Sequence, residues 1–368
     1  MKIKAAVARA KAAPLCLETI EVGDPRPGEV LIRVHASGIC HTDLAMRDQT
    51  FPVPQPIVLG HEGAGVIAAV GAGVTGLAVG DHVATSFDSC GECPICLEGE
   101  PAYCLQAFPR NFGGSRLDGS TAFSKDGEKI HSNFFGQSSF AEYTICHHRS
   151  VVKVPKEIPL EVLAPLGCGI ATGAGAVMNV FHLKQGQSMV VFGAGAVGLA
   201  AILAARALGA SAIIAVGRNK LKMDLAKQFG ATHIIDGNHP NVPEAVKAIV
   251  PGGVRYALDT TAVPRIIENA FASLGTLGML GVLGVSQPTE TMALPLIDAI
   301  SVGKSVRGIV EGDAIPQVLI PKLIELYQQG KCPFDKMSTY YPFDKINEAI
   351  HDAETGKVIK AVLRMNVN

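Results

Sequence analysis

The sequence predicts an α/β protein with two domains, one of mostly antiparallel β structure and one built on a doubly wound parallel sheet. The 368 residues exceed the roughly 150 residues of an ordinary domain. Up to about residue 164, short β-like runs are separated by glycine and proline. From about residue 172, apolar strands alternate with helical stretches, which is typical of βαβ units.

The elements follow this order along the chain. The β-rich half is represented by runs at residues 29–34 and 65–70. In the second half, we expect strands at 189–192, 212–216, 255–259 and 278–282, and a helix over 197–208. Because the pattern changes again near residue 304, the C-terminal segment is expected to rejoin the first domain. The predicted domains are therefore residues 1–169 with 303–368, and residues 170–302.

Composition and charge narrow the classes of function. With 48% hydrophobic and 18% charged residues and a net charge of -1, the chain is neither disordered nor basic enough to favour nucleic acid or an anionic membrane. Three charge-free stretches, at 162–181, 188–205 and 269–289, are rich in glycine and alanine and fit buried strands and helices better than membrane spans. No signal-peptide-like core follows the N-terminus. We expect a cytoplasmic protein that acts on a small molecule.

Four cysteines form a compact motif that is typical of a metal site. Cys90, Cys93 and Cys96 are separated by two residues each, and Cys104 follows after seven. Four thiolates at such spacing suit a closed tetrahedral zinc site, whose role is to fold the surrounding loop. Chance clustering and an iron–sulfur cluster are the alternatives.

A glycine motif predicts a dinucleotide site. The predicted strand at 189–192 leads into Gly193, Gly195 and Gly198 in the pattern G-x-G-x-x-G, which opens the predicted helix. There, the glycines, together with Ala196 and Val197, would bring the helix N-terminus close to a pyrophosphate. A glycine turn that only packs helix on strand is the alternative.

The next predicted strand ends without the carboxylate that binds the adenosine ribose in NAD-dependent enzymes. Gly217 stands at that position, and Arg218, Asn219 and Lys220 follow. No acid repels a 2′-phosphate here, and Arg218 could bind one in bidentate fashion with Asn219 or Lys220 assisting. We expect NADP(H) to be preferred over NAD(H). The alternative is that Arg218 only stacks on adenine and both cofactors are used.

A second set of metal-ligand residues, Cys40, His61 and Cys168, is dispersed, and spacing alone would not assemble it. The segment 60–65, Gly-His-Glu-Gly-Ala-Gly, with Gly71 and Val74, resembles the zinc signature of medium-chain alcohol dehydrogenases. That family also carries a four-cysteine lobe, and the resemblance spans nearly the whole chain. Segments 110–114, 134–140 and 165–170 resemble the bacterial aryl-alcohol and geraniol dehydrogenase branch.

The resemblance implies a GroES-like catalytic domain with two zinc ions and a Rossmann cofactor domain. Cys40, His61 and Cys168 would hold a catalytic zinc with one open position. Asp43 would orient His61, and Glu62 would lie behind the metal. Polyol-acting members often carry Glu where this chain has Cys168, which favours simple alcohols.

The resemblance also implies roles in proton transfer and cofactor binding. Thr42 would pass the alcohol proton to the cofactor ribose, although Ala45 replaces the histidine that completes the relay in many relatives. The alternative is that the Thr42 hydroxyl only stabilises a turn. The remaining cofactor contacts implied are His41, Thr172, Leu280, Val282 and Lys360.

The expected activity is therefore the interconversion of primary aromatic or allylic alcohols and aldehydes by a zinc enzyme that prefers NADP(H). An NAD(H)-dependent enzyme, a zinc-free quinone or enone reductase and a non-catalytic NADPH-binding protein are the alternatives. Phenylalanines at 87, 108, 112, 134 and 135 are candidates for an apolar substrate pocket. We expect a homo-oligomer, a tetramer ahead of a dimer, with the apolar stretch 269–289 as the associating sheet edge.

Overall fold

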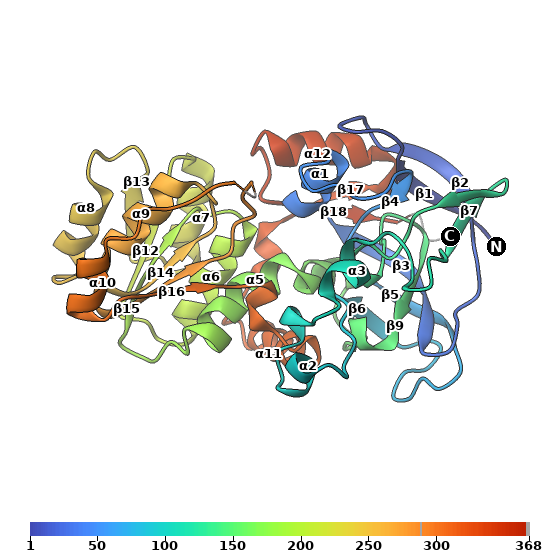
Figure 1. The fold of residues 1–368 in the computed structure, drawn as a ribbon, viewed down its shortest axis with the longest axis horizontal. Coiled ribbons are helices and arrows are strands. Elements are labelled where there is room, and N and C mark those ends of the chain that lie inside the picture. Colours follow the sequence, from blue (N-terminus) through green and yellow to red (C-terminus); the bar gives the residue numbers. More distant parts are fainter. Residues whose placement is uncertain (288, 366–368) are drawn as a thin grey trace. The chain divides into compact units, whose positions relative to one another are not determined.

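A computed structural model describes residues 1–287 and 289–365 and divides the chain into two compact units (Figure 1). Unit 1 contains Met1–Cys168, Ile315–Pro321 and the described chain from Asp335 onward. Unit 2 contains Gly169–Ala314 and Lys322–Phe334. The first is mostly β, and the second alternates strands and helices.

Unit 1 is built on two sheets. The five-stranded sheet has the order β4-β1-β2-β7-β8 and comprises β1 (Lys2–Ala8), β2 (Cys16–Val22), β4 (Ile57–Val58), β7 (Phe123–Lys125) and β8 (Glu128–Ile130). The second sheet has the order β10-β6-β5-β3-β18-β17, with β9 beside β3, and comprises β3 (Glu29–Gly38), β5 (Glu62–Val70), β6 (His82–Thr85), β9 (Tyr143–His147), β10 (Val151–Lys153), β17 (Ser338–Pro342) and β18 (Lys360–Arg364).

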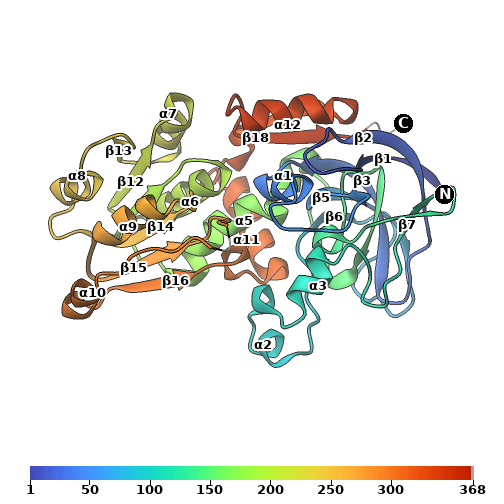
Figure 2. The same ribbon diagram turned by 45° about the horizontal axis from the view of Figure 1, so that its top comes forward.

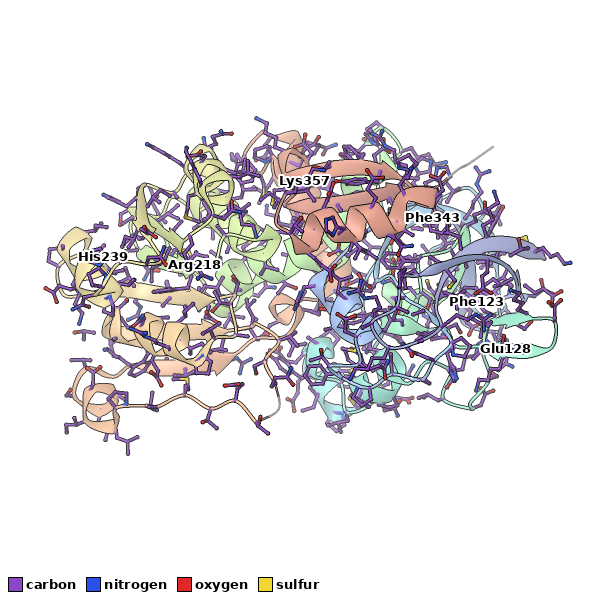
Figure 3. The ribbon with its side chains drawn as sticks, turned by 90° about the horizontal axis from the view of Figure 1, so that it is seen from above. Phe123, Glu128, Arg218, His239, Phe343 and Lys357 are labelled. Atoms are coloured by element: carbon purple, nitrogen blue, oxygen red, sulfur yellow. The ribbon has the colours of Figure 1, made fainter. Side chains whose placement is uncertain are left out.

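Short helices connect these strands. They are α1 (His41–Arg47), α2 (Pro94–Leu97), α3 (Ala107–Phe112), α4 (Leu160–Leu163) and α12 (Ile346–Glu354), with the 3₁₀ turns η1 (Pro101–Tyr103), η2 (Phe134–Gly136) and η4 (Ala164–Gly167). The largest core cluster of this unit includes Phe123 and Phe343, both labelled in Figure 3. Burial of such apolar side chains is the main force that closes the unit.

The pairing of β3 with β5 is the part of unit 1 that matters for chemistry. The strands are antiparallel, and Gly38 at the end of β3 faces Glu62 at the start of β5. A Cβ atom on Gly38 would overlap the Glu62 carboxylate, so only glycine fits. This register brings Cys40, just after β3, to the same end of the sheet as His61, just before β5.

Unit 2 contains a six-stranded parallel sheet with the order β13-β12-β11-β14-β15-β16 (Figure 2). Its strands are β11 (Ser188–Phe192), β12 (Ala212–Gly217), β13 (His233–Asp236), β14 (Val254–Asp259), β15 (Leu274–Val282) and β16 (Ser305–Gly308). Its helices are α5 (Gly169–Gly175), α6 (Ala196–Ala207), α7 (Lys220–Phe229), α8 (Val242–Ile249), α9 (Pro264–Ala272) and α10 (Leu296–Val302). Helix α11 (Pro316–Gln328) begins in unit 1 and ends in unit 2.

Two expectations about this sheet differ from the structure. The predicted boundary at 302/303 is too early, because β16 pairs in parallel with β15 and so extends the sheet of unit 2. For the same reason, the apolar stretch 269–289 is not the sheet edge: β15 lies between β14 and β16. The short sequence of β16 carries too weak a pattern to reveal a strand.

Within the described residues, no single helix is both long and apolar enough to cross a membrane. The bent pair Leu160–Gly167 and Gly169–Val180 meets the length and composition requirements only when the two segments are combined. Most of its residues are buried within the protein.

The three glycines at the β11–α6 turn differ in how much room they have for a side chain. Gly193 has a φ of +90°, and a Cβ there would overlap the Thr260 hydroxyl. A Cβ on Gly198 would overlap the carbonyl oxygen of Gly193, whereas a Cβ on Gly195 would meet no atom within 4 Å. The first and third glycines therefore shape the turn, and the second leaves the backbone open to the outside.

We expect Gly198→Ala to destabilise unit 2, because overpacking of this kind costs about 1–3 kcal/mol. Gly195→Ala is the matched control and should cost no more than about 0.5 kcal/mol. Thermal unfolding followed by circular dichroism compares the two variants with the parent. Equal melting temperatures for both variants would contradict this account of the turn.

Candidate metal centres and cofactor site

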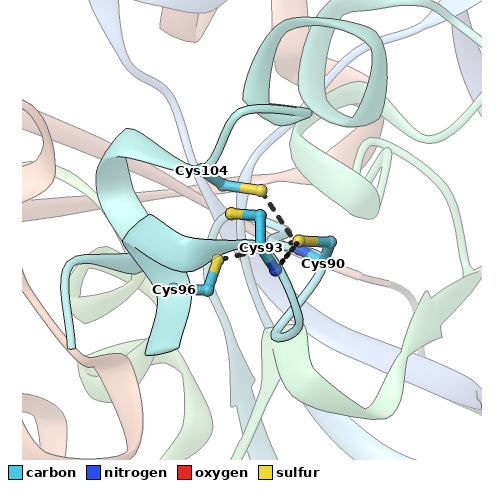
Figure 4. Close-up of side chains that lie close together, drawn as sticks. All are labelled: Cys90, Cys93, Cys96 and Cys104. Carbon is cyan, nitrogen blue, oxygen red and sulfur yellow. Dashed lines mark hydrogen bonds between the residues drawn. The ribbon is translucent and has the colours of Figure 1, made fainter. Parts of the chain in front are cut away.

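The four cysteines of the compact motif converge in unit 1. The sulfur atoms of Cys90, Cys93, Cys96 and Cys104 all lie within 4.8 Å of one another (Figure 4). Helix α2 begins directly after Cys93, and η1 ends directly before Cys104, so one short loop carries all four. Four sulfur donors and no carboxylate or imidazole form the donor set of a closed zinc site.

Backbone N–H groups prepare these sulfurs to carry negative charge. The N–H of Cys93 donates to Sγ of Cys90 at 3.2 Å, and the N–H of Cys90 donates to Sγ of Cys104 at 3.3 Å. Hydrogen bonds from the backbone N–H groups of Cys96 and Leu105 lower the pKa of Cys93 to about 6. These hydrogen bonds favour the thiolate, the form that binds a metal, at Cys93, whereas burial raises the pKa of Cys96 and of Cys104.

The dispersed residues also converge. Ligand atoms of Cys40, His61, Glu62 and Cys168 lie within 4.8 Å of one another, all within unit 1. Cys40 precedes α1, His61 precedes β5, and Cys168 follows η4. Among the described residues, Nε2 of His61 is buried and has no hydrogen-bond partner. A buried imidazole nitrogen left open between two thiols fits a metal ion with two sulfur ligands and one nitrogen ligand.

Asp43 holds this arrangement in place. Its Oδ1 accepts a hydrogen bond from the N–H of Gly60 at 3.0 Å and lies 2.8 Å from Nδ1 of His61. Its Oδ2 accepts from the N–H of Cys40 at 2.9 Å. The carboxylate therefore joins two ligand-bearing segments and favours the tautomer with the proton on Nδ1, which leaves Nε2 as the metal-binding atom.

The protonation of the cluster follows from burial and charge. The hydrogen bond from Cys168 holds the pKa of Cys40 well below its usual value, against the opposing effect of burial. Burial by itself lowers the pKa of His61, but the charge of Asp43 and its hydrogen bond outweigh that effect and raise the pKa. The cluster therefore favours a thiolate beside a histidine that Asp43 orients.

Glu62, one of the four clustered residues, forms a buried ion pair with Lys360. Nζ of Lys360 lies 2.8 and 2.9 Å from the two carboxylate oxygens and also donates to the carbonyl of Ile39 at 3.1 Å. Burial raises the pKa of Glu62. For Lys360, burial lowers the pKa, but the charge of Glu62 outweighs it and the net shift is upward. Lys360, expected to contact the cofactor, is thus bonded to Glu62 and Ile39.

Thr42 and His41 lie in the first turn of α1. Oγ1 of Thr42 is 3.8 Å from Sγ of Cys40, so the hydroxyl lies beside the candidate metal centre. His41 is exposed. In unit 2, Oγ1 of Thr172 donates to Glu311 at 3.3 Å, and on β15 Leu280 is buried and Val282 half-buried.

Aromatic rings cover one side of His61. The Phe135 ring stacks on the imidazole with centroids 4.5 Å apart, and the Phe134 ring meets its edge at 5.5 Å. Phe112 packs against Phe135 at 5.1 Å, and Phe108 against Phe112 at 5.6 Å. Of the five candidate phenylalanines, these four contact one another through their rings, and Phe134 and Phe135 belong with Phe87 to the buried core of unit 1.

A pocket of about 490 Å³ opens in unit 2 at the carboxyl ends of β11, β12 and β14. The predicted residues that line it are Gly193, Gly195, Gly217, Arg218 and Asn219. Arg218 is labelled in Figure 3. This is the position at which parallel sheets bind dinucleotides.

Four other residues predicted to bind the cofactor do not line this pocket. Ala196, Val197 and Gly198 lie in the first turn of α6 and do not line the pocket. Lys220 also lies outside it: its side chain is 88% exposed and pairs with Asp224 at 2.8 Å.

The pocket contains a cation that sequence reasoning missed. Lys222 lines it, two residues after Lys220. Asn219 caps α7 by accepting a hydrogen bond from the N–H of Lys222, so the helix turns Lys222 toward the pocket. The capping residue could have been predicted from the sequence, but the side of α7 that faces the pocket depends on how the helix packs on the sheet.

Comparisons with known proteins agree with this geometry. The family model for the alcohol dehydrogenase GroES-like domain matches residues 26–156, and that for zinc-binding dehydrogenases matches residues 196–329. The chain is 45% identical over 362 residues to geraniol dehydrogenase of Castellaniella defragrans, covering 98% of this chain and 97% of the relative.

Two solved structures are similar over nearly their whole length. Benzyl alcohol dehydrogenase from Acinetobacter calcoaceticus has a TM-score of 0.96 and 45% identity, with 99% of each chain covered. An alcohol dehydrogenase zinc-binding domain protein from Burkholderia ambifaria has a TM-score of 0.98 and 47% identity, with 100% of each chain covered.

The predicted fold class and family resemblance are thereby confirmed. The matches extend over both units and include the segments that carry both cysteine-containing clusters and the glycine turn. The protein is therefore a member of the zinc-binding medium-chain alcohol dehydrogenases, within their aryl-alcohol and geraniol branch.

Proposed function

We propose that this chain interconverts primary aromatic or allylic alcohols and their aldehydes, with zinc at Cys40, His61 and Cys168 and with NADP(H) as the preferred cofactor. The observation that carries the proposal is the buried, unpartnered Nε2 of His61 between two thiols, with Phe135 stacked on the same ring. It combines a metal donor set with an apolar aromatic wall at one place.

The bound groups would supply the reactive chemistry: zinc polarises an alcohol or carbonyl oxygen, and nicotinamide accepts or donates the hydride. The side chains around the site would orient the zinc ligands and hold the proton that is transferred. Asp43 fixes the direction of the His61 ring. The hydroxyl of Thr42, beside Cys40, is placed to hold a proton at Oγ1. The Glu62–Lys360 pair adds no net charge at the cluster.

The names of the similar proteins support the substrate class. Geraniol and benzyl alcohol are both primary alcohols with unsaturated carbon next to the carbon that bears the hydroxyl. The ring of Phe112, which is half-buried and packs against Phe135, offers an apolar surface on which such substrates can pack. Cys168 supplies a thiol at the position where polyol-acting relatives often carry Glu.

The cofactor preference rests on charge in the unit 2 pocket. Gly217 brings no carboxylate, and a Cβ there would meet only the flexible end of Met223. Arg218 and Lys222 both line the pocket and could bind a 2′-phosphate. If Arg218 only stacked on adenine, the enzyme would use both cofactors or NAD(H).

An exposed sheet edge supports the proposal of a homo-oligomer, a tetramer ahead of a dimer. Strand β16 lies at one edge of the unit 2 sheet, and all four of its residues are exposed. Nearby in sequence, α10 exposes Leu296, Ile297 and Ile300. A solvent-exposed strand at the edge of a sheet together with exposed apolar side chains favours self-association.

The direct test compares initial rates for benzyl alcohol, geraniol, ethanol and 2-propanol, before and after zinc is removed by a chelator and restored. We expect the first two to have the highest kcat/KM and the activity to disappear and return with zinc. A higher kcat/KM for ethanol or 2-propanol would refute the substrate class. Full activity after both zinc equivalents are removed would refute the metal assignment and favour a zinc-free reductase.

For the cofactor, Gly217→Asp should reverse the preference, because a carboxylate repels a 2′-phosphate and binds a ribose diol. We expect KM for NADPH to rise at least about tenfold while KM for NADH falls; a tenfold change corresponds to about 1.4 kcal/mol. Lys220→Ala is the control, because Lys220 is exposed outside the pocket. Unchanged KM values for both cofactors in Gly217→Asp would disprove the assignment.

For proton transfer, Thr42→Val should lower kcat by roughly 100-fold or more, the usual contribution of a positioned proton-transfer group. Thr42→Ser retains the hydroxyl and should stay close to the parent. Zinc content, measured by mass spectrometry, should equal the parent value in both variants. Full turnover in Thr42→Val would show that the hydroxyl has only a structural role.

A further inference from the structure

A buried amide, that of Gln137, lies next to the candidate catalytic metal centre. Gln137 follows η2 and is 1% exposed. The turn that carries it is strained: Asn133, Phe135 and Ser138 have φ values of 62°, 50° and 74°. Such values are unfavourable for residues other than glycine and persist only when surrounding contacts enforce them.

The side chain of Gln137 uses both ends of its amide. Its Oε1 accepts hydrogen bonds from the N–H of Gly63 at 3.1 Å and from the Thr85 hydroxyl. Its Nε2 donates to the carbonyl of His61 at 2.9 Å and to the carbonyl of Ser86 at 3.3 Å. The amide therefore joins His61 and the start of β5 to the end of β6.

The same chain of contacts extends to the Cys168 segment. Oγ of Ser86 donates to the carbonyl of Gly167 at 2.7 Å, one residue before Cys168. A Cβ on Gly167 would overlap the carbonyl of Thr85, so this segment packs directly on the end of β6. Through Ser86, the Gln137 amide thus connects the backbones that carry two of the three candidate zinc ligands.

The turn also places the aromatic wall. Phe134 and Phe135 immediately precede Gly136 and Gln137, and both rings contact the imidazole of His61. The amide therefore fixes the His61 backbone from one side while the residues beside it pack on the His61 ring. A side chain that only filled space could not set both positions.

We propose that Gln137 is a positioning residue of the catalytic zinc site, which holds His61 and Cys168 at the separation that retains the metal. This inference rests on the proposed function. Partners that orient metal ligands typically contribute 10- to 100-fold to metal affinity or activity, and loss of the amide leaves the buried His61 and Ser86 carbonyls without this donor.

The test uses Gln137→Met, which keeps the shape and removes every hydrogen bond of the amide. Zinc release is followed with a chelating dye, and the visible d–d absorption of the cobalt-substituted protein reports ligand geometry. We expect one of the two zinc equivalents to leave roughly 10- to 100-fold faster than in the parent, with a shifted cobalt band. The equivalent at the four cysteines should leave at the parent rate.

Two further variants separate positioning from general stability. Ser86→Ala cuts the contact with Gly167 and leaves Gln137 in place, so it should change zinc release in the same direction by a smaller factor. It decides the question if Gln137→Met does not fold. Ser37→Ala is the matched control, since it removes a different buried hydrogen bond, the 2.7 Å contact with Ser139, and should change neither measurement.

Three results would overturn the inference. The first is a parental release rate and cobalt spectrum in Gln137→Met, or in Ser86→Ala if only that variant folds. The second is an equal acceleration of both zinc equivalents, which would indicate a general loss of stability. The third is a parent protein that binds zinc only at the four cysteines, which would refute the proposed function itself and this inference with it.

Discussion

The candidate zinc site of unit 1 depends on one buried carboxylate. Asp43 accepts hydrogen bonds from the backbone of Cys40 and Gly60 and orients His61. It is fully buried, so its charge is tolerated only because these donors surround it. Without that carboxylate, the tautomer of His61 would not be fixed, and the backbones of Cys40 and Gly60 would lose the hydrogen bonds that join them. The candidate zinc site is therefore as much a product of Asp43 as of its own ligands.

Around this carboxylate, the fold adds a layer of contacts from distant parts of the chain. Lys360, on the last strand, is brought to Glu62 because β18 pairs with β3. A buried pair of this kind adds little net stability, since desolvation offsets the attraction, but losing either partner would leave a buried charge. The pair therefore constrains which residues can lie beside the candidate metal centre. Gly38 is part of the same constraint, because only glycine leaves room for the Glu62 carboxylate.

Each unit contains a site that depends on one residue type: glycine in the turn of unit 2 and cysteine in the loop of unit 1. In unit 2, the glycines before α6 create an open backbone turn at the end of a strand, where a helix N-terminus favours an anion. In unit 1, the four cysteines of one loop require only local chain geometry, with backbone N–H groups that stabilise thiolates. The glycine turn and the four-cysteine loop are each formed by a short stretch of chain. The candidate catalytic centre, by contrast, needs three separate segments to meet, and Gln137 is the residue that connects two of them.

The sequence by itself determined the features whose geometry is local: the alternation of strands and helices, the four-cysteine loop and the glycine turn. The dispersed ligands Cys40, His61 and Cys168 could be connected only through family resemblance, because no short-range spacing brings them together. Tertiary structure alone decided that β16 extends the parallel sheet, that Lys222 and not Lys220 faces the pocket, and that Gln137 lies behind His61. The physical reason is that strand register, helix phase and buried hydrogen bonds between distant segments depend on the packing of the whole unit, which neighbouring residues do not encode.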